Sequence, residues 1–216
     1  MDWDNARFNM VEQQIRTWNV LDKGVLDLLL QLKREDFVPA AHRDLALVDM
    51  EIPLGNGVKL WQPKMEARVV QTVALKPTDR VLEIGSRTGY VAALMAKLAK
   101  HVYAVDISEE MADATRANLA KASIGNVTVE VGDAVRGWAK HAPYDVIVAS
   151  GSYPLAPEFL LEQLTEGGRL FAVIGEEPVM TATLFTKQGG QIKRQGLWET
   201  VIAPLNNAPQ PERFSF

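Results

Sequence analysis

Cysteine is absent from the 216-residue sequence, and histidine occurs only three times. The absence of cysteine excludes disulfide bonds, cysteine-ligated zinc, iron–sulfur clusters and a thiol nucleophile. The histidines, His42, His101 and His141, show neither the spacing of a metal site nor a partner acid that the sequence indicates. We therefore predict structural roles for all three and no metal site.

Long apolar runs and an excess of positive charge are also missing. The chain carries 23 Lys and Arg against 27 Asp and Glu, a net charge of -4. No global positive field draws it to nucleic acid or anionic lipid, so we predict neither partner. Apolar runs such as 146–149 are far shorter than the roughly 20 residues of a membrane-spanning helix. The polar, acidic first ten residues do not resemble an export signal, and we expect a cytoplasmic protein.

With 47% hydrophobic residues, the chain has enough apolar side chains for one globular domain, 1–216. Up to residue 75 the pattern is mainly helical. Apolar residues from Met10 to Leu32 recur every three or four positions, which predicts two amphipathic helices joined near Asn19. We expect them to form a cap packed on the sheet. Prolines and glycines in 50–63 predict a loop or hairpin on the substrate side, and a helix follows over 64–74.

From Lys76 onward, short apolar runs alternate with helical stretches. Continuous β-branched runs are typical of strands that are covered on both faces. The sequence therefore predicts an α/β fold, a Rossmann-like, doubly wound and mostly parallel sheet with a C-terminal antiparallel hairpin. In the cofactor-binding core (76–175), the predicted strands are 80–85, 101–107, 126–133, 144–150 and 168–175. The predicted helices of this core are 90–99, 108–122 and 157–164. In the terminal hairpin and tail (176–216), the predicted strands are 179–187 and 192–204.

The ends of these strands carry the residues that point to chemistry, because ligands of such sheets lie beyond the carboxyl ends. The first strand leads into a turn from Glu83 to Gly89 that opens a helix, where backbone N–H groups hold anionic groups. The second ends in Asp106, a carboxylate placed to accept both hydroxyls of a ribose. The third ends in Asp133, and the fourth in the segment 150–152. The turn has neither the Gly-x-Gly-x-x-Gly spacing of dinucleotide folds nor that of a P-loop.

The motifs VLEIGSRTGY (81–90), VYAVDI (102–107), GDA (132–134) and PYDVIV (143–148) resemble those of class I S-adenosylmethionine-dependent methyltransferases. The segments FNMVEQQI, REDFVPA and IAPL add a more specific resemblance to the protein-L-isoaspartate O-methyltransferase family. The ordered resemblance covers almost the whole chain. It implies an enzyme that methylates the α-carboxylate of L-isoaspartyl residues in damaged proteins, with S-adenosylmethionine as cofactor and a protein or peptide as partner. The oligomeric state stays open.

The resemblance also assigns residues. It implies that the turn after the first strand holds the methionine end, Asp106 the ribose, and Asp133 the adenine region. IAPL (202–205) is expected near the substrate peptide. The implied cofactor-binding residues are Glu83, Gly85, Ser86, Gly89, Asp106, Ile107, Asp133 and Ala134, and those implied beside the transferred methyl group are Trp61, Ser150 and Ser152. Structural roles are alternatives for several of them, as a loop cap for Glu83, turn residues for the serines and a core side chain for Trp61.

Two residues depart from the family pattern. Arg87 stands where the family has a glycine, and Trp61 stands where it has a hydroxyl residue. The Arg87 side chain either obstructs the cofactor or pairs with its carboxylate. The alternatives to isoaspartyl methylation are accordingly a non-catalytic interaction module and a methyltransferase with a changed acceptor.

Overall fold

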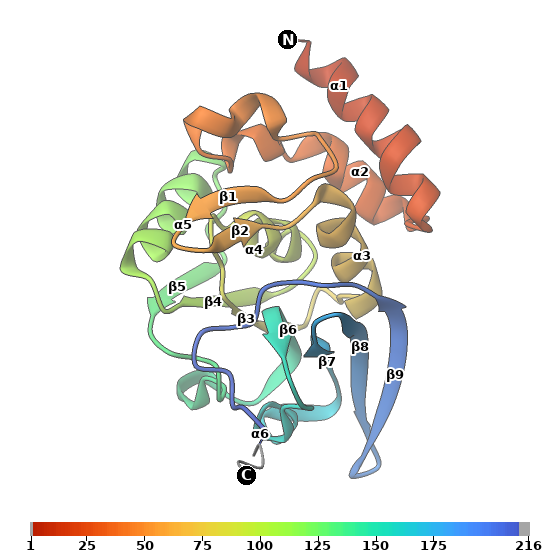
Figure 1. The fold of residues 1–216 in the computed structure, drawn as a ribbon, viewed down its shortest axis with the longest axis vertical. Helices are drawn as coiled ribbons and strands as arrows, with labels where there is room; N and C mark the ends of the chain where they lie inside the picture. The colour runs from red at the N-terminus through yellow and green to blue at the C-terminus, as the bar shows by residue number, and fades with distance from the viewer. Residues whose placement is uncertain (1, 212–216) are drawn as a thin grey trace.

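The computed structural model describes residues 2–211, and the tail aromatics Phe214 and Phe216 lie outside them. A seven-stranded sheet forms the centre, in the order β5-β4-β3-β6-β7-β8-β9 (Figure 1). Its strands are β3 (Arg80–Ile84), β4 (His101–Asp106), β5 (Val127–Val131), β6 (Tyr144–Tyr153), β7 (Leu164–Glu176), β8 (Val179–Gln188) and β9 (Gln191–Glu199). β5, β4, β3, β6 and β7 run parallel, while β8 and β9 add an antiparallel hairpin. The predicted fold class is confirmed.

Both faces of the central strands are buried, as their continuous apolar runs predict. In β3, Val81 packs into one core with the N-terminal half of the chain, and Leu82 packs into a second core on the opposite face. This division follows from the two-residue period of a strand, which turns successive side chains to opposite faces. The helices that accompany the sheet are α3 (Pro63–Val73), α4 (Tyr90–Ala96), α5 (Glu109–Lys121) and α6 (Glu158–Leu161), with a 3₁₀ turn at Ala139–His141.

Local sequence signals set the ends of these helices. Pro63 opens α3, where a missing N–H costs no hydrogen bond. Ser108 caps α5, because its hydroxyl accepts the amide hydrogen of Met111 at 3.3 Å between heavy atoms. In the hairpin of β1 (Ile52–Gly55) and β2 (Val58–Leu60), residues 55–57 form the tight turn that the glycines predict.

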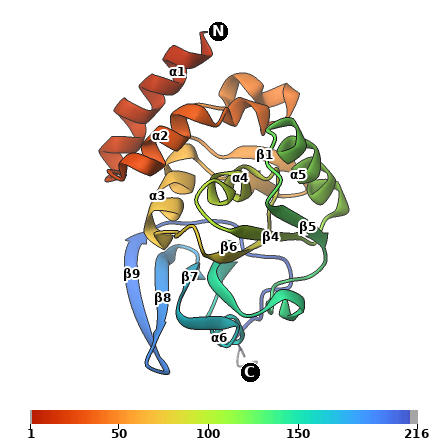
Figure 2. The same cartoon turned by 180° about the vertical axis from the view of Figure 1, so that it is seen from behind.

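The N-terminal cap is less regular than two plain helices. Its elements are α1 (Trp3–Asn9), a π-helix (Met10–Ile15), a 3₁₀ turn (Arg16–Trp18), α2 (Lys23–Gln31) and two further 3₁₀ turns (Arg34–Asp36 and Ala40–Leu45). Asn19 ends the first helical run in the left-handed conformation, at φ 62°, where the sequence predicts the junction. The cap packs mainly on α3, which lies between it and the sheet, rather than on the strands themselves (Figures 1 and 2).

Among the described residues, no helix combines the length and the apolar character needed to cross a membrane. The segment after β9 runs back over the sheet and pairs with β6 through a parallel bridge between Ser152 and Pro204 (Figure 1). It therefore brings residues 202–206 over the carboxyl ends of the parallel strands, where the predicted site lies.

Candidate functional site

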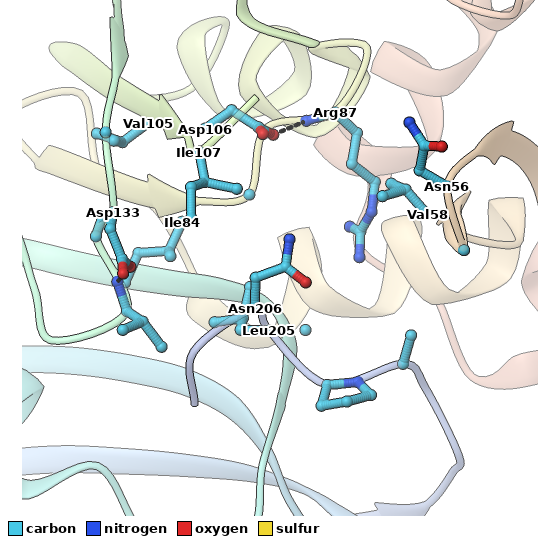
Figure 3. Close-up of a pocket in the computed structure, with 18 of the residues that line it drawn as sticks. Asn56, Val58, Ile84, Arg87, Val105, Asp106, Ile107, Asp133, Leu205 and Asn206 are labelled. Carbon is cyan, nitrogen blue, oxygen red and sulfur yellow. Dashed lines mark hydrogen bonds between the residues drawn. The ribbon is translucent and has the colours of Figure 1, made fainter. Parts of the chain in front are cut away.

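A cavity of about 300 Å³ opens at the carboxyl ends of β3, β4 and β5 (Figure 3). Its walls come from the turns after these strands, from the β1–β2 hairpin and from residues 203–206. The volume lies at the lower end of the range for small-molecule sites. The predicted residues Gly85, Asp106 and Asp133 all line it, although they are far apart in the sequence.

Asp106 is oriented by the backbone around it. Its two carboxylate oxygens accept hydrogen bonds from the amides of Arg87 at 2.9 Å and Ser108 at 3.0 Å. The side chain is 6% exposed and borders the cavity, as does the neighbouring Ile107. Each oxygen keeps a further lone pair, so the carboxylate can accept additional hydrogen bonds from a ligand's hydroxyl groups.

Asp133 occupies the opposite part of the cavity wall, with Ala134 beside it. One oxygen of Asp133 accepts the amide of Val135 at 3.0 Å, and the other accepts the side-chain amide of Asn207 at 2.8 Å. Asn207 belongs to the segment after β9, so this bond fixes that segment against the turn after β5. No sequence signal links the two residues, which lie 74 positions apart.

The glycines of the β3–α4 turn have different surroundings. Gly85, at φ 83°, lines the cavity, and a Cβ atom there would lie 3.4 Å from Leu205. Gly89, at φ 84°, begins α4 away from the cavity, and a Cβ atom would come within 2.8 Å of the Thr115 methyl group. Ser86 is also outside the lining and lies 3.3 Å from the Thr115 hydroxyl. Of these two glycines, the first therefore borders the cavity, while the second allows close packing on α5.

Glu83 lies behind the cavity wall and is 1% exposed. One of its oxygens lies 3.5 Å from the Ser150 hydroxyl, and the other has no hydrogen-bond partner within residues 2–211. Burial raises the pKa of Glu83 to about 8, although Arg87 acts in the opposite direction. The carboxyl group is therefore mostly protonated at neutral pH and supports the turn without contributing a full charge.

Ser150 and Ser152 do not follow the fourth core strand as predicted, because β6 continues to Tyr153. The strand is longer than its apolar run indicates, since Ser152 and Tyr153 still pair with β7 after an irregularity, and Ser152 also forms a bridge to Pro204 in the segment after β9. The Ser152 hydroxyl donates to the Ile202 carbonyl at 3.3 Å. Both serine side chains are buried outside the cavity lining, whereas Gly151 between them borders the cavity.

Trp61 lies two residues before α3, with Gln62 between them, and is 2% exposed. It borders a second cavity, of about 180 Å³, rather than the first. The Arg87 guanidinium lies over the ring, 4.9 Å from its centroid, and lines the first cavity. The two departures from the family pattern are thus in contact, between two neighbouring cavities.

Several lining residues have no signal in the sequence. Asn56 and Val58 reach the cavity from the β1–β2 hairpin, and Asn206 reaches it from the segment after β9 (Figure 3). Their approach depends on long-range packing, so neither composition nor spacing indicates it. The IAPL segment (202–205) contributes Leu205 to the first cavity, beside Gly85 and Gly151.

Comparison with known proteins decides the family. The sequence model of Protein-L-isoaspartate(D-aspartate) O-methyltransferase (PCMT) matches residues 5–210. The chain belongs to this family. Two bacterial members named protein-L-isoaspartate O-methyltransferase share 36% identity (Roseiflexus castenholzii, over 95% of this chain and 94% of theirs) and 38% identity (Rhodopseudomonas palustris, over 94% and 95%).

Solved structures of the same family agree with the fold. A protein-L-isoaspartate O-methyltransferase aligns with a TM-score of 0.79 and 26% identity, over 94% of this chain and 66% of that chain. A putative member from Plasmodium falciparum, solved in complex with S-adenosyl-L-homocysteine, gives 0.78 and 20% identity, over 93% and 98%. The resemblance drawn from the motifs is confirmed, including the enzyme class that the family name states.

Proposed function

We propose that the chain is an S-adenosylmethionine-dependent O-methyltransferase that methylates the α-carboxylate of L-isoaspartyl residues in damaged proteins. The observation that carries this proposal is the meeting of Gly85, Asp106 and Asp133 in one cavity, in a chain of this family. Asp106 would bind the ribose hydroxyl groups, and charge-assisted bonds of this kind contribute about 1.5–3 kcal/mol each. Asp133 and Ala134 would flank the adenine, with Ile107 beside them.

The residues around the cavity fit this cofactor. Gly85 leaves the turn open because it has no side chain, and the Asp106 carboxylate keeps lone pairs toward the cavity. The bound cofactor supplies a sulfonium methyl group. The chain itself contributes alignment, with Gly85 on the methionine side and the segment 150–152 with Trp61 as the acceptor wall. Ser86, Gly89 and Glu83 would act indirectly, by shaping the turn.

The reaction demands few catalytic groups of the protein. A free carboxylate with a pKa of about 4 is already ionised at neutral pH, so no general base is needed. Alignment of the acceptor oxygen with the methyl group is worth up to about 7–11 kcal/mol in favourable systems. This accounts for a site without cysteine or histidine. The proposed partner is a cytoplasmic protein or peptide rather than nucleic acid, consistent with the net charge of -4.

A methyltransferase with a changed acceptor is the second candidate. It is favoured by the buried Trp61 ring and by the Arg87 guanidinium, which replace a hydroxyl residue and a glycine at the border of the two cavities. Such a bulky, charged wall selects acceptors by shape and by charge.

Transfer of a labelled methyl group tests both candidates. We expect an L-isoaspartyl peptide to accept label while its L-aspartyl twin does not, and we expect Asp106→Ala to abolish transfer. Label on neither peptide, from a protein that binds S-adenosylhomocysteine, would reject the isoaspartyl acceptor and favour the second candidate. Absence of cofactor binding would reject both.

A further inference from the structure

Arg87 occupies an unusual position in the β3–α4 turn. Its backbone adopts φ 53°, a left-handed conformation that residues with side chains seldom adopt. The side chain is partly buried and extends along the cavity, where one terminal nitrogen donates to the Ser150 carbonyl. The Trp61 ring lies against the guanidinium. Contacts on two sides therefore hold the charged group at the cavity wall (Figure 3).

The guanidinium has more donors than these contacts use. It carries five N–H donors, and its one hydrogen bond within residues 2–211 goes to the Ser150 carbonyl. In the same part of the chain, no carboxylate forms an ion pair with it. A partly buried cation with unused donors toward a cavity is costly unless an anion completes its partners.

The neighbouring acids do not supply that anion. Glu83 is the nearest in electrostatic effect, but burial raises its pKa to about 8, so it is mostly neutral at pH 7. Glu66 is paired with Arg34, and Glu51 is paired with Lys59. Asp106 accepts backbone amides at the other side of the turn. None of these four acids is therefore available as an ion-pair partner for Arg87.

The place of the guanidinium within the cavity indicates what it meets. Figure 3 shows Asp133 and the Arg87 guanidinium on opposite sides of the opening. Gly85 lies near Ser150, the residue whose carbonyl accepts a hydrogen bond from the Arg87 guanidinium, because a Cβ atom on Gly85 would come within 3.7 Å of the Ser150 Cβ. The guanidinium is thus on the side of the glycine turn, away from the part that the proposed function assigns to adenine. A planar guanidinium pairs best with a carboxylate, through two parallel hydrogen bonds.

We propose that Arg87, held by the Trp61 ring and the Ser150 carbonyl, binds a carboxylate group inside this cavity. The inference rests on the proposed function, because that reaction offers two carboxylates, one at the amino-acid end of the cofactor and one on the acceptor. The cofactor is the better match, because its carboxylate takes no part in the reaction. An acceptor carboxylate bound through both oxygens would have less electron density available for attack on the methyl group. Trp61 is a positioning residue in this arrangement.

Calorimetric titration with two nucleosides tests the proposal. S-adenosylhomocysteine carries the carboxylate, and 5′-methylthioadenosine has the same nucleoside and thioether without it. We expect Arg87→Gln to weaken S-adenosylhomocysteine about 10- to 100-fold and methylthioadenosine less than about 2-fold. Trp61→Ala should weaken only the first ligand, by about 3- to 10-fold, and Trp61→Phe should restore most of that loss.

Lys64→Gln is the matched control, since it removes a positive charge from the wall of the second cavity, outside the lining of the first. Lys64 is already paired with Asp49, so both affinities should stay within about 2-fold of the wild type. Thermal unfolding of each variant checks that the protein stays folded. If Lys64→Gln reproduced the Arg87→Gln pattern, general electrostatic attraction would replace the specific pairing and overturn the proposal.

The remaining outcomes also decide it. If Arg87→Gln leaves S-adenosylhomocysteine binding unchanged but raises the KM of an isoaspartyl peptide at least 10-fold with kcat nearly constant, Arg87 binds the acceptor's carboxylate. Unchanged affinities and unchanged KM, or tighter binding of both nucleosides, would overturn the proposal. If the wild-type protein binds both nucleosides but methylates no peptide, the isoaspartyl function is rejected and the role of Arg87 is not. If Arg87→Gln weakens both nucleosides equally while methylation stays intact, the role of Arg87 is rejected and the isoaspartyl function is not.

Discussion

Two arginines contact Trp61 from different sides, and their surroundings differ sharply. Arg34 is 0% exposed and pairs with Glu66, with 2.7 Å between its Nε and a carboxylate oxygen. It also donates to the carbonyls of Ala46 and, at 2.6 Å, Trp61. Arg87 has a single carbonyl partner within residues 2–211 and faces a cavity. Arg34 thus has an ion-pair partner within the protein, whereas Arg87 has none among residues 2–211.

The difference separates a structural charge from a functional one. A buried ion pair with all its hydrogen bonds satisfied fixes geometry, here the backbone at Trp61, and has no remaining capacity for a ligand. A cation with unused donors at a cavity wall keeps that capacity at a cost in stability. The two arginines should therefore respond differently to substitution.

The largest effect is expected for Arg34→Ala, which leaves the Glu66 carboxylate buried without its partner. Burial already raises the pKa of Glu66, while Arg34 opposes this shift. We expect the free energy of unfolding to fall by about 3–5 kcal/mol, measured by urea denaturation. The double variant Arg34→Met with Glu66→Met should lose clearly less, because no unpaired charge remains. Equal losses in the two variants would show that packing, not the charge pair, stabilises this region.

A second prediction concerns the pH dependence that Glu83 imposes beside Arg87. In the unfolded chain its carboxyl group loses the proton near its ordinary pKa of 4.5, whereas in the folded protein it keeps the proton up to about pH 8. The free energy of unfolding therefore falls as the pH rises through this interval. We expect Glu83→Gln to gain on the order of 3 kcal/mol relative to the wild type between pH 5 and pH 8.

Chemical denaturation at a series of pH values measures this gain. The exposed Glu110→Gln on α5 is the control and should follow the wild-type profile. A Glu83→Gln profile parallel to the wild type would mean that the carboxyl group is ionised in the folded protein, with Arg87 as its effective partner.

A smaller effect is expected from Gly89→Ala, which disturbs the turn that carries Arg87. The Thr115 hydroxyl donates to the Arg87 carbonyl at 3.0 Å, and the Thr115 methyl group lies 2.8 Å from the added Cβ atom. We expect a loss of about 1–2 kcal/mol in thermal or urea unfolding. Gly167→Ala has a similar φ, 77°, with open space around it, so its loss isolates the backbone contribution. Equal losses would show that Thr115 moves aside freely.

The smallest effect on stability is expected for Arg87→Gln without ligand, under about 1 kcal/mol, because the lost carbonyl bond and ring contact are offset by relief of burial. Burial indeed lowers the pKa of the Arg87 guanidinium. Differential scanning calorimetry with and without S-adenosylhomocysteine measures it. A loss as large as that of Arg34→Ala would remove the distinction between the two arginines.

Much of the fold is readable from local patterns. The apolar runs predict the core strands within a few residues, and Ser108 and Pro63 begin helices as their chemistry indicates. The end of β6 is the main difference, since its last residues pair with β7 beyond an irregularity and Ser152 bridges Pro204, 52 positions later. The π-helix at Met10–Ile15 is also not predicted, because its apolar spacing is compatible with an ordinary helix.

For the candidate site, the sequence identifies the residues at strand ends but not the direction of their side chains. Gly85, Asp106 and Asp133 meet because parallel strands end at one edge. The direction of Arg87 depends on Trp61, which lies 26 positions earlier and is fixed by Arg34. The spacing of residues in the sequence does not predict this series of contacts. It does not predict the buried ion pair of Arg34 and Glu66 either.

The bridge at Ser152 has a consequence for hydrogen exchange. The Ser152 amide donates to Ala203 and its carbonyl accepts the Leu205 amide, both at 3.1 Å, so one residue of β6 holds the segment that borders both cavities. The amide protons of Ser152 and Leu205 should exchange together, at a rate set by release of this segment from the sheet. Their protection factors, measured without ligand, therefore report how often the segment after β9 separates from β6 and opens the two cavities.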